Sequence, residues 1–132
     1  MSAPPTTRFE LRCSPHAPAA ARRLVRSALR SCASGDERGD LVADAELLVS
    51  ELISNAVIHG QCDRTVCEIE VRPAGRVRIA VSDPGLSGEI RTRTADLGGT
   101  GGMGLHLVGR LATEWGQEHQ PGRRTVWFEL EP

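Results

Sequence analysis

Hydrophobic residues recur along the first half of the chain at the spacing that is typical of amphipathic helices. Residues 19–32 and residues 41–58 carry apolar side chains three and four positions apart, with polar residues between them. Asp40 precedes the second segment as an N-cap residue, and Gly60 follows it as a stop signal. The pattern predicts two helices, joined by a loop of glycine and charged residues at 33–39.

Alternation of apolar and polar residues, which is typical of strands, replaces helical spacing elsewhere. It predicts a short strand at 9–13 and a last strand at 125–130. Segments 67–72 and 77–82 alternate in the same way on either side of a turn sequence at 73–75, so they predict a β-hairpin with one buried face.

Between the hairpin and the last strand, the character of the chain changes. Segment 83–104 contains seven glycines and few apolar residues, which is typical of a long functional loop. A third helix is predicted from residue 105 to about residue 115. Because strands and helices do not alternate regularly, the order favours a two-layer α+β sandwich, with helices on one face of a mixed, mostly antiparallel sheet.

Length and composition favour one soluble domain spanning residues 1–132, with residues 1–7 expected to be disordered. The formal net charge is -1, which gives no reason to expect nucleic acid or a membrane as a partner. No apolar run approaches the roughly 20 residues that span a bilayer, and no signal peptide is recognisable at the N-terminus. We therefore expect a cytoplasmic protein.

The basic residues and cysteines exclude several classes of protein. All sixteen basic residues are arginine, and a P-loop NTPase, a Hanks-type kinase or a Schiff-base enzyme would need a lysine. Cys13, Cys32, Cys62 and Cys67 are scattered and form no C-x-x-C pair. Reduced thiols are therefore expected rather than a zinc site or a disulfide framework.

Polar residues interrupt the second predicted helix in the sequence ELISNAVIHG. Glu51, Asn55 and His59 are each four positions apart, so a helix places them on one stripe beside the apolar face. An amide oxygen suits a phosphate-bound magnesium ion, and a carboxylate can take a proton from a hydroxyl nucleophile. A solvated helix surface explains the first two residues equally well, and a helix-end cap explains His59.

Two further features follow the hairpin. Asp83 stands where a strand ends and can accept a hydrogen bond from an exocyclic amine, while Gly85 allows a ligand close to the backbone. A plain turn explains the same residues. The glycine cluster at 99–104 precedes a helix and can offer amides to a phosphate, although a linker is an equal alternative. Its G-x-G-x-x-G pattern does not indicate a Rossmann fold, because no strand lies directly before it and too little chain follows.

Together and in this order, the three features resemble the nucleotide-binding boxes of the GHKL ATPase and kinase superfamily. ELISNAVIHG resembles its N box, VSDPGLSG its adenine box and GTGGMGLHLVGRLATEWG its glycine box. The short length and the ending GRRTVWFEL are most similar to anti-sigma-factor serine/threonine kinases of the RsbW type. The resemblance covers residues 9–130 and implies the GHKL form of the α+β sandwich.

The resemblance also implies ATP and Mg²⁺ as ligands. Asn55 would hold magnesium against the phosphates, and Asp83 would bind the adenine amino group in a pocket shaped by Gly85. Glu51 would be the general base that activates a serine on a protein substrate.

Four further residues receive nucleotide-binding roles from the same resemblance. Gly102 and Gly104 would offer backbone amides to the phosphates. Thr125 would back the adenine through water, and His59 would touch the nucleotide. The adenine box departs from the family pattern at Ser87, which stands where a second glycine is usual. The loop that would close over the triphosphate is also short.

The resemblance implies a partner-switching protein. It would sequester a sigma factor or a related regulator, phosphorylate a serine on an anti-anti-sigma antagonist of the STAS type, and form a homodimer. The alternative is a catalytically silent module that binds its partner with or without sensing a nucleotide, and a metabolic ATPase is a more distant third reading.

Overall fold

The computed structural model describes residues 6–32, 39–59, 63–83 and 108–132, and the structural statements below refer to these residues. They form two long helices and five strands. In chain order the elements are β1 Thr6–Arg12, α1 Ala17–Cys32, α2 Gly39–His59, β2 Arg64–Val71, β3 Val77–Asp83, β4 Glu114–Gln120 and β5 Arg123–Leu130. A short helical segment at 108–111 precedes β4.

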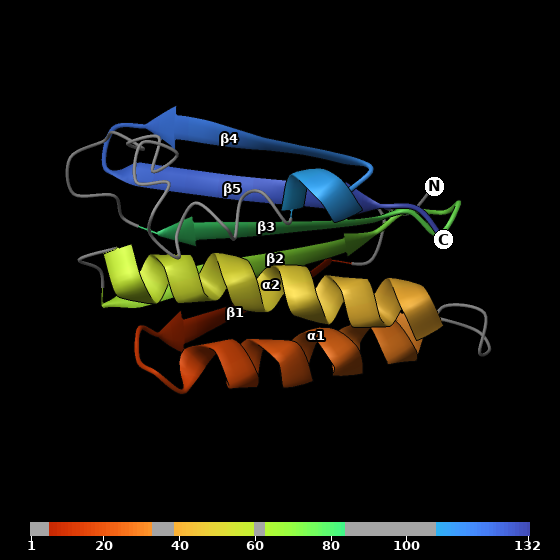
Figure 1. Cartoon of the computed structure of the whole chain (residues 1–132), viewed down its shortest axis with the longest axis horizontal. Helices are drawn as coiled ribbons and strands as arrows, with labels where there is room; N and C mark the ends of the chain where they lie inside the picture. The colour runs from red at the N-terminus through yellow and green to blue at the C-terminus, as the bar shows by residue number, and fades with distance from the viewer. Residues whose placement is uncertain (1–5, 33–38, 60–62, 84–107) are drawn as a thin grey trace.

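The five strands form one sheet in the order β1-β2-β3-β5-β4, and the helices lie on one of its faces (Figure 1). α1 packs against β1 and β2, α2 packs against β3 and β5, and the two helices pack against each other. The predicted two-layer α+β sandwich is therefore confirmed. All four pairings within the sheet are antiparallel, so the described strands contain none of the parallel pairs that a mixed sheet would have.

The core lies between the sheet and the helices, where the alternating positions of the strands meet the apolar stripes of the helices. Its largest fully buried side chains are Leu29, Leu48, Ile53, Ile69, Ile79 and Phe128. Each buried strand residue is followed by a less buried one on β2, as the sequence pattern predicts. Burying such side chains stabilises the fold by about 1.5–3 kcal/mol each, which makes this layer the main source of stability.

The predicted hairpin is present as β2 and β3, joined by a tight turn. The Gly75 amide donates to the Arg72 carbonyl at 2.8 Å, and the Arg72 amide donates to the Arg76 carbonyl at 2.8 Å. Gly75 has a φ angle of 87°, a left-handed conformation that a residue without a Cβ adopts without strain.

Two predicted boundaries are wrong. Thr6 and Thr7 belong to β1, where they pair with β2, so they are not part of a disordered N-terminus. The third helix was expected to reach about residue 115, but β4 begins at Glu114. The β4 sequence EWGQEHQ has one large apolar residue and no β-branched residue, so its strand conformation depends on pairing with β5 rather than on its own pattern.

Two further expectations concern the state of the cysteines and the presence of a membrane-spanning helix. Cys13 and Cys67 are not in disulfide bonds, and burial raises the pKa of the Cys67 thiol, which keeps it protonated. The structure does not describe the side chains of Cys32 and Cys62. None of the described helices has both the length and the apolar character needed to cross a bilayer.

Gly116 on β4 leaves room for the indole of Trp127. A Cβ at Gly116 would lie 2.8–2.9 Å from three ring atoms of Trp127, closer than packed atoms approach. We expect Gly116→Ala to lower the free energy of unfolding by about 1–3 kcal/mol, because the ring must move. Urea denaturation followed by circular dichroism measures this change. Gly109→Ala is the matched control, since its new Cβ would lie 3.5 Å from Trp115 in ordinary contact; an equal loss in both variants would contradict the steric explanation.

Candidate functional site

Three of the predicted site elements meet at one end of the molecule. The C-terminal end of α2, the last residue of β3 and the first residues of β5 lie at the same end of the sandwich (Figure 1). The antiparallel pairing of β3 with β5 requires part of this arrangement, because it places the end of one strand beside the start of the other.

On α2, Glu51 and Asn55 are one turn apart and half-buried. Glu46 lies on the flank of α2 that faces α1, because its carboxylate accepts hydrogen bonds at 2.7 and 3.1 Å from Arg26 of α1. Asn55 comes nine residues after Glu46, which is about two and a half helical turns, so its side chain leaves α2 on the opposite flank, away from α1. The predicted polar stripe therefore does not belong to the contact between the helices. His59 is the last residue of α2, and its side chain lies outside the described residues.

Asp83 carries a carboxylate into the buried row of β3. Val77, Ile79 and Val81 face the helices, and the two-residue period of the strand turns Asp83 to the same side. Its side chain is only 6% exposed, which requires a partner for the charge. Arg124 provides that partner from β5: its Nε and Nη2 donate to Oδ2 of Asp83 at 3.3 and 3.1 Å.

Neighbouring hydrogen bonds fix the backbone that leads to Asp83. Thr65, fully buried at the start of β2, donates its hydroxyl to the carbonyl of Ser82 at 3.0 Å. The register pairs Asp83 with Arg124 directly. The carboxylate is therefore held at a fixed place, as a group that recognises a ligand must be.

Thr125 lies on the face of the sheet opposite Asp83. Thr125 pairs with Ser82, and their hydroxyl oxygens lie 2.9 Å apart on the sheet face away from the helices. Asp83 points to the opposite face, because neighbouring residues of a strand alternate. Arg124, rather than Thr125, therefore occupies the position across from the aspartate, and the role of Thr125 behind the adenine stays a prediction. The sequence analysis did not single out Arg124. Its spacing of two and four residues from Val126 and Phe128 nevertheless indicates that its side chain lies on the helix-facing side of the strand.

Gly85, Gly102, Gly104 and Ser87 lie within residues 84–107, outside the described part of the chain. The predictions for the adenine-box and glycine-box backbones therefore stay predictions. Among the described residues, Asp83 and Arg124 are in contact, and Glu51 and Asn55 lie in the half of α2 that ends at the same end of the molecule.

Sequence comparison decides the family. Residues 14–130 match the profile of the histidine kinase-like ATPase domain. The chain belongs to this family. Membership gives the protein the fold of ATP-dependent kinases and ATPases of the GHKL group and implies an ATP site. No curated protein sequence matches the chain significantly.

Solved structures with the same fold include two bacterial proteins. The structure of the RsbU and RsbW domains of a Mycobacterium tuberculosis protein matches with a TM-score of 0.71 and 23% identity, over 96% of this chain and 32% of that one. The histidine kinase domain of a blue-light-activated histidine kinase from Erythrobacter litoralis matches with a TM-score of 0.50 and 19% identity, over 86% of this chain and 60% of that one. This ATPase domain thus spans about a third of the length of the first protein and about three-fifths of the length of the second.

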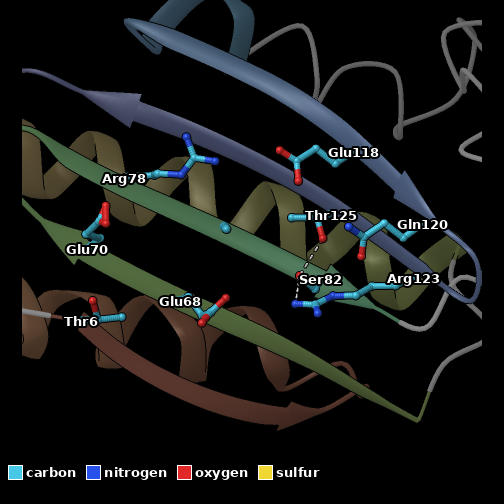
Figure 2. A pocket seen from close by; sticks show the side chains of 10 residues that line it. Thr6, Glu68, Glu70, Arg78, Ser82, Glu118, Gln120, Arg123 and Thr125 are labelled. Carbon is cyan, nitrogen blue, oxygen red and sulfur yellow. Dashed lines mark hydrogen bonds between the residues drawn. The ribbon is translucent and has the colours of Figure 1, made fainter.

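The other face of the sheet in this ATPase domain is polar. A hollow of about 300 Å³ lies on it, with acidic walls formed by Glu68, Glu70 and Glu118 and basic walls formed by Arg78 and Arg123 (Figure 2). Because it lies on the face opposite Asp83, this hollow is separate from the predicted nucleotide site.

Glu129 organises the charges at one end of this polar face. It is 5% exposed and accepts hydrogen bonds from Arg76 and, at 3.0 Å, from Arg78. The Arg78 guanidinium also lies 4.1 Å from the ring centre of Trp127. Burial alone would raise the pKa of the Glu129 carboxyl, but the hydrogen bonds from the two arginines outweigh it and hold the pKa below its ordinary value.

This lowered pKa predicts a pH-dependent contribution to stability. The contribution is present above the pKa of an unfolded glutamate and is lost as the pH falls through the lower pKa of the folded state. We expect Glu129→Gln to lower the free energy of unfolding at pH 7 by about 1–3 kcal/mol, with the difference shrinking below about pH 4. Urea unfolding from pH 7 to pH 3 measures it. Glu118→Gln, at an exposed position on the same face, should change little; a pH-independent effect of Glu129→Gln would contradict the ionic explanation.

Proposed function

We propose that this domain is an anti-sigma-factor-type protein serine/threonine kinase. It binds ATP with Mg²⁺ at the shared end of α2, β3 and β5 and transfers the γ-phosphoryl group to a serine of an anti-anti-sigma (STAS-type) antagonist. The observation that carries the proposal is the buried carboxylate of Asp83, at the end of a strand in a histidine kinase-like ATPase domain, with Glu51 and Asn55 on the nearby helix.

The chemistry of Asp83 and Asn55 suits this ligand. Asp83 offers a fixed acceptor to the adenine amino group. Asn55 offers a neutral amide oxygen, a ligand that magnesium accepts alongside phosphate oxygens. A magnesium ion at Asn55 would also bind oxygens of the triphosphate and water molecules, the ligands that magnesium usually keeps in nucleotide sites.

Glu51 provides a base one turn before Asn55. Its half-buried carboxylate would take the proton of the substrate serine as the serine oxygen attacks the γ-phosphorus. The bond from that phosphorus to the bridging oxygen then breaks, and ADP leaves. Positioning and charge neutralisation supply most of the acceleration in such reactions. Gly85, Gly102 and Gly104 would shape the pocket and bind phosphates, and His59 would touch the nucleotide.

The partners follow from the same proposal. The structural similarity to a protein with RsbU and RsbW domains supports a role in partner switching. The domain would sequester a sigma factor or a related regulator, act as a homodimer, and work in the cytoplasm. The even mixture of charges on the open sheet face gives no support for nucleic acid as a direct partner.

A second candidate is a catalytically silent module that binds its regulator without phosphoryl transfer. The pairing of Asp83 with Arg124 favours it, because one oxygen of the carboxylate expected to bind adenine already accepts hydrogen bonds from the protein. Calorimetric titration of the purified protein with ATP and magnesium separates the two candidates: absence of binding, or binding without transfer to any antagonist, favours the silent module.

The kinase proposal predicts a specific loss in Glu51→Gln. Because an amide cannot accept the serine proton, we expect phosphoserine formation on the cognate antagonist to slow by at least about 100-fold, while ATP affinity stays near that of the wild type. Incubation with labelled ATP measures the rate, and calorimetry measures the affinity. Asp44→Asn, about two turns earlier on α2, is the matched control and should transfer phosphate normally. Transfer by Glu51→Gln at the wild-type rate would remove Glu51 from the mechanism.

Asn55→Ala tests the magnesium site separately. Loss of the amide oxygen should weaken Mg-ATP by about tenfold or more, because the metal loses its proposed protein ligand. Binding of ATP without magnesium should change less. Titrations with and without magnesium give both affinities, and an equal effect under both conditions would show that Asn55 does not act through the metal.

A further inference from the structure

The carboxylate of Asp83 forms one half of a pair whose other half is Arg124. The two residues lie directly across from each other on β3 and β5, and two guanidinium nitrogens reach the same carboxylate oxygen at 3.1 and 3.3 Å. Their side chains are 6% and 16% exposed. The pair is therefore part of the helix-facing side of the sheet rather than a surface ion pair.

The geometry of the pair leaves hydrogen-bonding capacity on both partners. Nε and Nη2 of Arg124 both donate to Oδ2 of Asp83, and within the described ranges no donor reaches Oδ1. A guanidinium has five N–H groups in one plane, so donors remain after this contact. Together the two side chains offer a carboxylate acceptor beside an arginine donor.

Adenine presents the complementary groups. Its six-membered ring carries an amino donor at N6 beside an acceptor at N1. A 6-oxopurine presents these groups in the reverse order, with an oxygen acceptor beside an N–H donor, and can match the pair only after the base shifts. A site that hydrogen-bonds a ligand group discriminates strongly against an analogue that lacks the group.

We propose that Arg124 is a specificity-determining residue that donates a hydrogen bond to N1 of adenine, while Oδ1 of Asp83 accepts from the N6 amino group. This inference rests on the proposed binding of ATP at Asp83. Thr125 has no part in it, because its hydroxyl bonds to Ser82 on the other face of the sheet.

A purely positioning role for Arg124 makes a different prediction. If the arginine only held the carboxylate, its loss would weaken all adenine nucleotides that carry the amino group to the same extent. If it reads N1, its loss removes the discrimination between ATP and 1-deaza-ATP, an analogue with carbon in place of N1. The ratio of these two affinities therefore separates reading from positioning.

The test is calorimetric titration of the full chain with Mg-ATP, 1-deaza-ATP and 7-deaza-ATP. The wild type should bind ATP and 7-deaza-ATP similarly and 1-deaza-ATP at least about tenfold more weakly, because a hydrogen bond to a charged donor is lost. Arg124→Met should bind ATP about tenfold more weakly than the wild type and should not distinguish ATP from 1-deaza-ATP. Arg123→Met is the matched control: it removes the same charge from the opposite face of the sheet, and should behave as the wild type.

Three results would overturn the inference. They are similar binding of ATP and 1-deaza-ATP by the wild type, retained discrimination in Arg124→Met, and tighter ATP binding by Arg124→Met, which would make the arginine a competitor of the base. The wild-type comparison needs no variant, so it decides the matter even if Arg124→Met does not fold. Failure of the wild type to bind any of the nucleotides would instead remove the proposed ATP site itself, and the inference with it.

Discussion

The side-chain alternation of β3, fixed by its antiparallel neighbours β2 and β5, is the constraint on which the rest of the structure depends. It sends Val77, Ile79 and Val81 into the core and continues the same row with Asp83. A shift of the register by one residue would turn this whole row toward the open face. The apolar core that stabilises β3 therefore also fixes the direction in which its terminal carboxylate points.

The two faces of the sheet have different physical chemistry as a result. On the helix side, apolar residues surround the pair of Asp83 and Arg124, and the hydrogen bonds of this pair are strengthened where water is scarce. On the open side, charged residues form networks around Glu129 and a polar hollow. The helix-facing side thus combines a rigid scaffold with a few oriented polar groups, which is the usual composition of a small-molecule site.

Most of the fold follows from local sequence patterns. The periodic spacing of apolar residues is clear in α1, α2 and the β2–β3 hairpin because each of these elements buries one face. The prediction of each is confirmed. β4 was missed because its sequence carries little apolar signal, and its pairing with β5 depends on residues that the local pattern does not include. Whether such an edge segment becomes a strand depends on hydrogen bonds to residues distant in sequence, and the local pattern of side chains does not reveal them.

The candidate site was only partly predictable for a related reason. Glu51, Asn55 and Asp83 stand out as polar residues that interrupt or end apolar patterns. Arg124 and Thr125 are adjacent in sequence but face opposite sides of β5. The alternation that assigns Val126 and Phe128 to the core also assigns Arg124 to the side of Asp83, which the family motif alone does not indicate.

The stacking of Trp127 over Gly116 has a spectroscopic consequence. The chain contains two tryptophans and no tyrosine, so its near-ultraviolet fluorescence comes from Trp115 and Trp127. They lie on opposite faces of the sheet, because Trp115 pairs with Phe128 and Trp127 pairs with Gly116. Trp127 is covered by the Arg78 guanidinium, whereas Trp115 is 38% exposed. Each indole is therefore an intrinsic optical reporter for one face of the same sheet.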